Sequence, residues 1–346
     1  MHLPTSEKKL ENRLFMTLSV IVVTLNRPQE LRRCLQCLHD QVPRPEQVIV
    51  VDASPDDLSR RISEEFASLG LDVLYLRNEN GYGHMTQSRN IGLLRATGAI
   101  IAFLDDDSFA HAGWRENLLA TYDDSKVGAV GGRALRDQPG EESEGVDEIG
   151  KLKPDGSLTG FFAADPGRIL EVDHIIGCNM SFRREALAKL GGFREDYPGS
   201  SVREETDLCL RVREIGYRIL FNPKAVVDHL GAPQAQGQRF DVRYSYYFQR
   251  NHVVMLWRNF GPKSPIFSRY LLSGARGTAQ DSFKRIASGV VRLGAFLGGT
   301  AAGMASGYRI VSRAGRSPVR NDEEGRKLRK ALSQPARQAP SHEDKA

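Results

Sequence analysis

Cysteine is scarce in this sequence, and its scarcity excludes a small fold held together by disulfides. The 346 residues include only four cysteines: Cys34, Cys37, Cys178 and Cys209. They are too few and too dispersed for a disulfide framework, which favours a reducing compartment. Cys34 and Cys37 form a C-x-x-C pair, but leucines alternate with them on a helical period. We therefore interpret the pair as buried helix positions rather than as a redox or metal pair.

Long apolar runs are also missing. No window approaches the roughly 18 to 20 apolar residues that a membrane-spanning helix needs. Residues 1–16, MHLPTSEKKLENRLFM, lack the continuous apolar segment of a secretory signal. The composition therefore predicts a cytoplasmic protein that does not span the membrane.

Apolar runs alternate with helical patterns from residue 18 onward. Buried strands are predicted at 18–24, 47–52 and 99–105, and helical periodicity at 28–41, 57–70 and 85–97. Strand and helix patterns resume at 171–196 and 202–223, and a last short strand is predicted within 224–232. The alternation predicts an α/β fold with a mostly parallel sheet and helices on both faces. Ligands of such sheets bind at the carboxyl ends of the strands.

Changes in composition along the sequence predict four parts. Residues 1–16 form an amino-terminal extension, 17–240 the catalytic domain, 241–312 a helical carboxyl-terminal extension, and 313–346 a basic tail predicted to be disordered. Within the domain, residues 136–160 are rich in glycine, proline and acids, and we expect a long loop or hairpin that could lie over a ligand.

Polar side chains follow three of the predicted strands. Thr24, Asn26 and Arg27 come after the first strand, Asp52 ends the second, and Asp105 to Asp107 end the strand AIIAFLDDD. Three adjacent carboxylates could be a solvated turn, a helix-capping region or a cation site. Their place at a strand end favours Mg²⁺ or Mn²⁺ bound together with a diphosphate, because such ions share carboxylate and phosphate oxygens.

Five blocks in order resemble the family 2 glycosyltransferases, which have the GT-A fold. The blocks are SVIVVTLNRPQELRRCLQCLHDQ, VIVVDASPDD, SRNIGLLRATGAIIAFLDDD, GCNMSFRREAL and EETDLCLRVREIGYRI. The resemblance covers residues 18 to about 230 and implies transfer of a sugar from a nucleotide diphosphate to an acceptor hydroxyl, with inversion at the anomeric carbon.

The resemblance also assigns roles to individual residues. It implies nucleotide contacts by Thr24, Asn26, Arg27, Asp52, Arg89, Asn90, Asp105 and Asp106. It implies metal ligation by Asp105, Asp107 and His229, although a lone histidine is as often structural. It places Gly177, Asn179 and Asp207 near the acceptor, where the alternatives are a simple strand-to-helix turn and a helix amino terminus.

The general base is expected in the block REETDLCLRV. The family commonly has Glu-Asp-x-Asp here, and its second acid falls on Glu205, with Glu204 before it and Asp207 after it. Glutamate in place of the usual aspartate leaves Glu204 and Asp207 open as alternatives, and all three could simply be favourable acids at a helix start. A second departure is Leu25, where similar sequences often carry an aromatic residue that could stack on the base, so the donor nucleotide is not assigned.

Charge is distributed unevenly along the chain. The net charge is +5 overall, but residues 1–250 carry −6 and residues 251–346 carry +11. The basic, aromatic region after residue 241 could contact an anionic membrane beside a lipid-linked acceptor, or it could pack as ordinary helices on the domain. Nucleic acid is not an expected partner, because no reader motif is present.

Two other functions compete with sugar transfer. A nucleotidyltransferase would need a glycine-rich phosphate loop after the first strand, and TLNRPQE contains no glycine. A non-catalytic binder of nucleotide sugars would retain the fold and the cation but would not turn over, and only Glu205 in place of aspartate suggests it.

Overall fold

The computed structural model describes residues 16–199, 201–231, 242–273 and 286–336, with the side chains of 286–292 left aside. The amino-terminal extension therefore lies almost wholly outside the described residues. The strands are β1 (Leu18–Thr24), β2 (Gln47–Asp52), β3 (Val73–Arg77), β4 (Ile100–Asp105), β5 (Ser108–Ala110), β6 (Val127–Leu135), β7 (Leu170–Glu171), β8 (Asn179–Arg183) and β9 (Arg218–His229). The α-helices are α2 (Pro28–His39), α3 (Leu58–Ser68), α4 (Met85–Leu93), α5 (Trp114–Ala120), α6 (Arg184–Leu190), α7 (Glu204–Glu214), α8 (Val242–Phe260), α10 (Ile286–Ala314) and α11 (Glu323–Leu332).

The strands form one mixed sheet in the order β3-β2-β1-β4-β8-β6-β9-β5, with β7 paired to β9. β1 to β4 are parallel to one another, as the alternating sequence pattern predicts. The later strands join mainly antiparallel, and only β6 and β9 pair in parallel. The strand predicted at the end of 202–223 and the one predicted within 224–232 form a single strand, β9. β9 continues through Asn222, and its pairing with β6 shifts register beside that residue.

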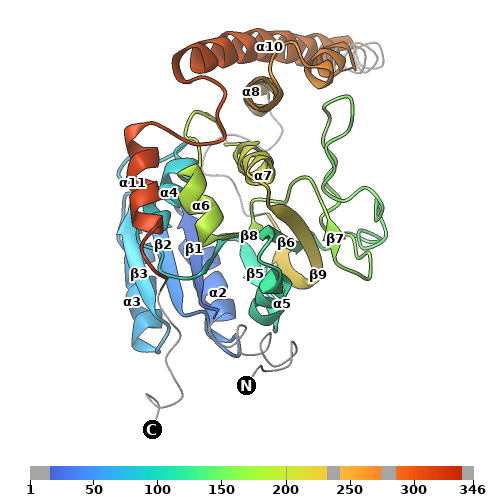
Figure 1. Ribbon diagram of the computed structural model, residues 1–346. Coiled ribbons are helices and arrows are strands. Elements are labelled where there is room, and N and C mark those ends of the chain that lie inside the picture. Colours follow the sequence, from blue (N-terminus) through green and yellow to red (C-terminus); the bar gives the residue numbers. More distant parts are fainter. Residues whose placement is uncertain (1–15, 200, 232–241, 274–285, 337–346) are drawn as a thin grey trace, which may run out of the picture.

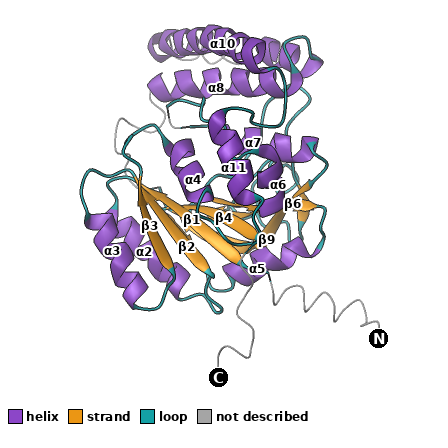
Figure 2. Ribbon diagram, turned by 60° about the vertical axis from the view of Figure 1, so that its left-hand side comes forward, coloured by secondary structure: helices purple, strands orange, loops and turns teal. Residues whose placement is uncertain are grey.

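Helices cover both faces of the sheet, as expected (Figure 2). Alternate side chains of β1, β2 and β4 pack on α2, α3 and α5 on one face, where Cys34 is buried among leucines. The other set packs on α4, α6, α7 and α11. The four cysteines are free thiols, and Cys34 is buried, as predicted for a core position. Cys37, predicted to be buried as well, is only half-buried and packs against the same core.

A third layer lies beyond α7. α8 and the helical residues 265–273 bury their own cluster, which includes Val253, Leu256 and Tyr270. α10 lies across α8 as the outermost element (Figure 1). The two helices approach closely because glycines face α8: a Cβ on Gly303 would lie 2.7 Å from Val253, and one on Gly307 would lie 2.8 Å from Trp257.

The expectation of a disordered tail is wrong for residues 313–336. Asp322 caps α11 by accepting a hydrogen bond from the Gly325 N–H at 2.7 Å. Leu328 and Leu332, one helical turn apart, are buried against the α4 and α6 side of the core. Residues 337–346 lie outside the described part of the chain.

The segment 136–160 is a loop, as predicted, but its tip packs away from the expected ligand. The Gly156 carbonyl accepts a hydrogen bond from His252 of α8 at 2.8 Å. A Cβ on Gly156 would lie 2.9 Å from Tyr270. The tip of the loop therefore packs against the layer formed by α8 and residues 265–273.

Candidate active site

A cleft of about 300 Å³ opens at the carboxyl ends of β1, β2 and β4. Its lining includes Thr24 at the end of β1, Leu25 and Arg27 in the loop that follows, Ala53 after β2, Asp105 at the end of β4, and Asp106 and Asp107 after it. The opposite wall comes from Gly81, Tyr82, Gly83, Met85, Ser88, Gly199, Val202 and Tyr244. Strand ends far apart in sequence converge here because parallel strands end at the same edge of a sheet.

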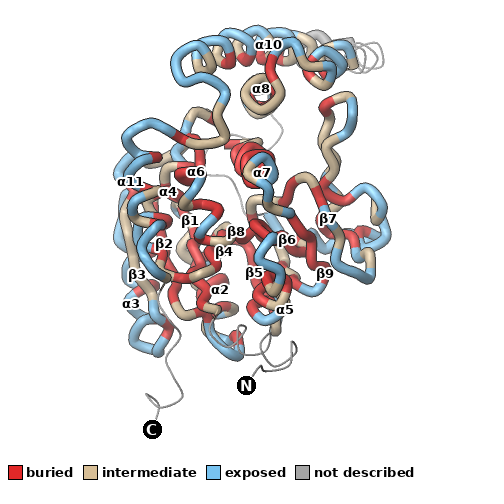
Figure 3. Tube along the Cα trace, in the orientation of Figure 1, coloured by how far each residue is buried: buried red, intermediate tan, exposed pale blue. Residues whose placement is uncertain are grey.

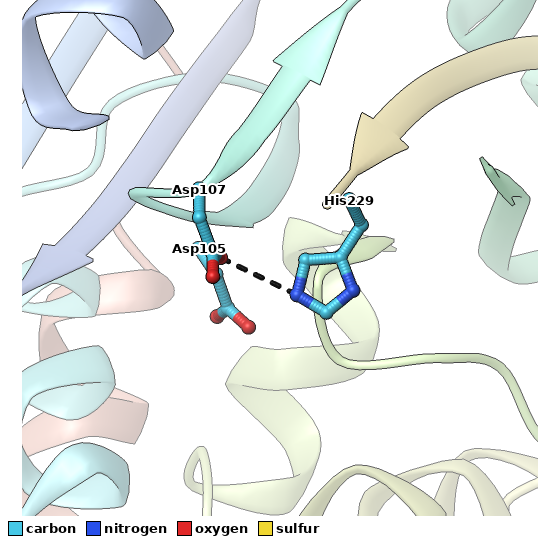
Figure 4. Close-up of side chains that lie close together, drawn as sticks. All are labelled: Asp105, Asp107 and His229. Atoms are coloured by element: carbon cyan, nitrogen blue, oxygen red, sulfur yellow. Dashed lines mark ion pairs between the residues drawn. The ribbon is translucent and has the colours of Figure 1, made fainter. Parts of the chain in front are cut away.

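Asp105, Asp107 and His229 meet in this cleft (Figure 4). One ligand atom from each lies within 4.8 Å of the others, a spacing suited to a single cation. β5 pairs with the end of β9 and aligns Ser108 with His229, which brings the imidazole beside the aspartates. Two carboxylates and an imidazole suit Mg²⁺ or Mn²⁺, with the remaining positions open to water and phosphate oxygens.

Positive groups surround the three aspartates. Arg27 Nη1 donates to Asp106 Oδ1 at 3.0 Å and to Asp107 Oδ2 at 3.4 Å. His229 Nε2 lies 3.3 Å from Asp107 Oδ1. Burial lowers the pKa of His229, but Cys178, Asp107 and Asp105 outweigh burial and raise that pKa to about 11. The same negative charge favours a divalent cation, which would bind His229 as the neutral imidazole in place of its proton.

Asp106 faces a different partner from its two neighbours. It is buried and accepts a hydrogen bond from the Thr24 hydroxyl at 2.7 Å as well as the one from Arg27. Burial raises the pKa of Asp106 to about 7, and Arg27 opposes the rise. Asp106 thus ties the β1 loop to the β4 loop, and it is absent from the three-residue cation cluster found among the described residues.

Asp52 is fully buried beneath the cleft. Its carboxylate accepts hydrogen bonds from the Ser54 N–H at 2.8 Å and the Tyr75 hydroxyl at 2.9 Å. The Ser54 hydroxyl in turn accepts from the Asn26 N–H at 2.8 Å, where Asn26 adopts a left-handed backbone with φ of 56°. The two loops after β1 and β2 therefore fix each other, and Ala53 rather than Asp52 lines the cleft.

Arg89 connects the aspartates to α7. It is buried, donates to Asp105 Oδ1 at 3.2 Å and to the Gly177 carbonyl at 3.4 Å, and pairs with Glu204 Oε1. Glu204 is buried too, and its second oxygen has no hydrogen-bond partner among the described residues. Gly177 is close enough that an added Cβ would lie 3.3 Å from Arg89.

Glu205 is half-buried on the first turn of α7, three residues after Val202 of the cleft wall. Its carboxylate accepts a long hydrogen bond from the Thr206 hydroxyl, at 3.5 Å. Burial raises the pKa of Glu205, and the nearby Arg203 guanidinium opposes the rise. A carboxylate with a raised pKa is a better proton acceptor near neutral pH than an ordinary one.

Nine predicted site residues are not among those that line the cleft: Asn26, Asp52, Arg89, Asn90, Gly177, Asn179, Glu204, Glu205 and Asp207. For three of them, other parts of the fold use the side chain. Asn90 donates to the Phe193 carbonyl at 2.9 Å and to Glu195 at 2.7 Å. Asn179, fully buried, accepts from the Trp114 indole at 3.0 Å and donates to two carbonyls. These contacts join helices and strands rather than a ligand.

Asp207 is the third. It accepts from Arg194 at 2.8 Å, from Arg211 at 3.5 Å and from Asn259 of α8 at 3.0 Å. Burial raises the pKa of Asp207, but these arginines and Arg258 outweigh burial and hold it well below its usual range. Asp207 is therefore the centre of a buried charge cluster between α7 and α8.

Sequence reasoning missed the opposite wall of the cleft. Gly81, Tyr82 and Gly83 precede α4, and Tyr244 comes from the first turn of α8. Tyr82 supplies an aromatic surface in a cleft where Leu25 stands at the position that is often aromatic. The signal was a tyrosine between two glycines, since both glycines adopt the positive φ that such a turn requires.

The fold and the converging strand ends define a GT-A glycosyltransferase, and comparison with known proteins agrees. The family model for glycosyl transferase family 2 matches residues 19–191, half of the chain. This protein belongs to glycosyltransferase family 2.

Relatives with described activities share much of the chain. The chain is 28% identical over 223 residues to a glucosyl-dolichyl phosphate glucuronosyltransferase of Haloferax volcanii, covering 62% of this chain and 69% of that protein. It is 30% identical over 214 residues to a pre-mycofactocin glycosyltransferase of Mycobacterium tuberculosis, covering 61% of this chain and 42% of that protein. The chain thus spans less than half the length of the mycobacterial relative.

Solved structures show the same fold. The mannosyltransferase PcManGT from Pyrobaculum calidifontis, in complex with GDP-Man and Mn²⁺, aligns with a TM-score of 0.52 at 18% identity, over 92% of this chain and 85% of that one. Among the described residues, none of the helices combines the length and apolar character needed to cross a bilayer.

Proposed function

We propose that this glycosyltransferase moves a sugar from a nucleotide diphosphate donor to an acceptor hydroxyl, with inversion and with assistance from Mg²⁺ or Mn²⁺. The observation that carries the proposal is the meeting of Asp105, Asp107 and His229 in a cleft also lined by the β1 loop. The cation, when bound, neutralises charge that develops on the departing diphosphate.

The chain's own residues orient the donor. Thr24 and Arg27 line the cleft on the side of the β1 loop, and Arg27 can offer further guanidinium N–H donors to ribose or phosphate. Tyr82 offers a face for the nucleotide base. Asp106 in the cleft wall holds the β1 loop through Thr24, and Arg89, which is not part of the lining, holds Asp105.

Inversion in a single displacement needs one group that removes the acceptor proton. We assign that role to Glu205, because its pKa is raised and its carboxylate has few partners within the described part of the chain. Glu204 is the alternative, since one of its oxygens is unpaired, but its buried contact with Arg89 suits a positioning role.

The acceptor is a glycan or lipid-linked glycan in this proposal, and the enzyme works in the cytoplasm, at the cytoplasmic face of the membrane. Support comes from the Haloferax volcanii relative, whose name specifies glucosyl-dolichyl phosphate as substrate. Gly177, close to Arg89 and Glu204, is retained as an acceptor-side residue.

Calorimetric titration with UDP, GDP, dTDP and CMP sugars, each with and without Mn²⁺ or Mg²⁺, tests the donor assignment. We expect one nucleoside diphosphate sugar to bind tightly only when the cation is present. Binding that is equally tight in EDTA would contradict the cation site, and no binding by folded protein would favour the alternative of a degenerate scaffold.

Glu205→Gln separates the base from binding. We expect donor affinity to stay within about twofold of wild type while transfer falls by roughly a hundredfold or more, because only proton removal is lost. Glu204→Gln is the matched comparison. A larger loss of transfer in Glu204→Gln than in Glu205→Gln, with donor affinity unchanged, would move the base assignment to Glu204.

A further inference from the structure

The outward side of α10 carries an apolar stripe that the described residues leave uncovered. Leu297, Ala301, Met304 and Tyr308 form this α10 outer stripe, and their spacing of four, three and four residues places them on one helical face. Leu297 is 56% exposed, Met304 38% and Tyr308 68%. Figure 3 shows the outer side of α10 as largely exposed.

The stripe is not needed to hold α10 in place. The opposite side of the helix packs on α8 through Gly299, Gly303 and Gly307, each within 3 Å of an α8 atom if a Cβ were added. A surface helix of a globular protein normally keeps polar residues on its outer side. Here apolar side chains occupy both sides, which indicates a second contact.

The charge of the helix identifies the kind of surface that fits. Ile286–Ala314 contains no Asp or Glu, and Arg309 and Arg313 are exposed toward its carboxyl end. The region after residue 250 carries a net charge of +11. Apolar side chains beside arginines, with a tyrosine at the boundary, match the apolar and anionic zones of a lipid headgroup region.

We propose that the α10 outer stripe docks on the surface of an anionic lipid bilayer, with the helix lying in the plane of the interface. Leu297, Met304 and Tyr308 insert among the headgroups, and Arg309 and Arg313 pair with lipid phosphates or carboxylates. The helix does not need to span the bilayer to bind in this way.

The α8 layer connects this surface to the active site. Tyr244 of α8 lines the cleft, and Arg243 lies over the Tyr82 ring at 5.9 Å. Tyr247 packs on Gly199 of the cleft wall. α8 therefore lies between a bilayer bound by α10 and the rim of the cleft. This inference rests on the proposed function, for which the arrangement presents the cleft to an acceptor carried by a lipid.

Vesicle co-sedimentation of the full chain tests the docking. The probes are phosphatidylcholine vesicles and vesicles with about a third phosphatidylserine. We expect binding to the anionic vesicles that weakens with salt, and little binding to the neutral ones. The double variant Leu297→Gln/Tyr308→Gln should bind at least tenfold more weakly, because two inserted side chains lose apolar burial. Arg309→Gln/Arg313→Gln should lose roughly tenfold at low salt.

Leu69→Gln is the matched control, since Leu69 is 53% exposed just after α3, at the end of the molecule away from α10 (Figure 1). It should bind like wild type. Unchanged vesicle binding by the Leu297/Tyr308 variant would overturn the proposal. So would a dimer, seen by light scattering, that the same variant dissociates.

Donor titration of the same variants separates this inference from the sugar-transfer proposal. We expect wild-type nucleotide-sugar affinity in solution, because the stripe is far from the aspartates. Vesicle binding without donor binding would refute the function and leave the surface intact, and the converse would refute the surface alone.

Discussion

The two halves of the sheet contribute unequal numbers of polar side chains to the cleft. In the parallel half, polar residues that follow β1 and β4 reach the cleft, and Thr24, Arg27 and the aspartates line it. In the mixed half, His229 at the end of β9 reaches the cleft, whereas Asn179 of β8 and Asp207 of the adjacent helix α7 are fully buried and bonded to protein. A polar residue at or beyond the end of a strand can face the cleft, whereas one inside a strand or helix of the core must satisfy its groups within the fold.

Asp207 gives the sharpest test of this difference. Asp207→Asn should lower the free energy of unfolding by about 3 to 5 kcal/mol, because it leaves buried Arg194 and Arg211 without their counter-ion. Urea unfolding measures the loss. Donor affinity should remain at the wild-type value. A weakened donor affinity with unchanged stability would instead assign Asp207 to the active site.

The pH dependence of the same variant has a definite sign. The pKa of Asp207 is lower in the folded state than its usual value, so its stabilisation is present above about pH 4 and is lost as the pH falls toward the folded pKa. Wild-type stability should therefore fall on acidification through this range, and Asp207→Asn should lose that part of the slope.

The tail provides the next largest effect. Leu328→Ala should reduce the free energy of unfolding by about 3 kcal/mol, because Leu328 is 1% exposed among core side chains. Leu69→Ala, at an exposed position, should change it by less than about 0.5 kcal/mol. Equal effects of the two substitutions in urea unfolding would show that α11 adds nothing to the core.

In the parallel half, Asp107→Asn should weaken cation-dependent donor binding on the order of a hundredfold. Loss of an outer-shell partner already costs up to about a hundredfold, and Asp107 is a proposed direct ligand. Calorimetry with Mn²⁺ measures it. Stability without cation should stay near wild type, so a large loss of stability with normal binding would make Asp107 a structural residue.

Tyr82→Ala should give the smallest change, about a fivefold loss of donor affinity, from a lost aromatic contact of about 1 kcal/mol. Tyr82→Phe is the control and should bind like wild type, because the ring is retained. If Tyr82→Ala leaves the affinity unchanged, Tyr82 is only part of the wall.

Much of the parallel half could be predicted from the sequence, because its strands are continuous apolar runs. The ends of those runs also located the three aspartates and the β1 loop in the cleft. The same reasoning overstated Asp52, because a strand end predicts which edge a residue reaches but not whether a neighbour such as Tyr75 already holds its side chain. The family resemblance overstated Asn90 of α4, whose side chain donates to Glu195.

The tail and the opposite wall could not be predicted for a different reason. α11 has the charged composition typical of a disordered segment. It is nevertheless ordered, because Leu328 and Leu332 on one of its faces pack on a matching surface of the core. That surface is on the α4 and α6 side of the core, and the position of Tyr244 depends on the packing of α8. Both are tertiary features that local periodicity does not encode.

The pairing of β5 with β9 has a consequence for how the protein matures during synthesis. Asp107 and His229 are separated by about a third of the chain, and β9 must align with β5 before His229 stands beside Asp107. A nascent chain that ends before β9 holds the aspartates without the imidazole. For the proposed cation site, this means that affinity would be acquired late in translation, and a cation that binds only the completed site would stabilise the contact between early and late parts of the chain.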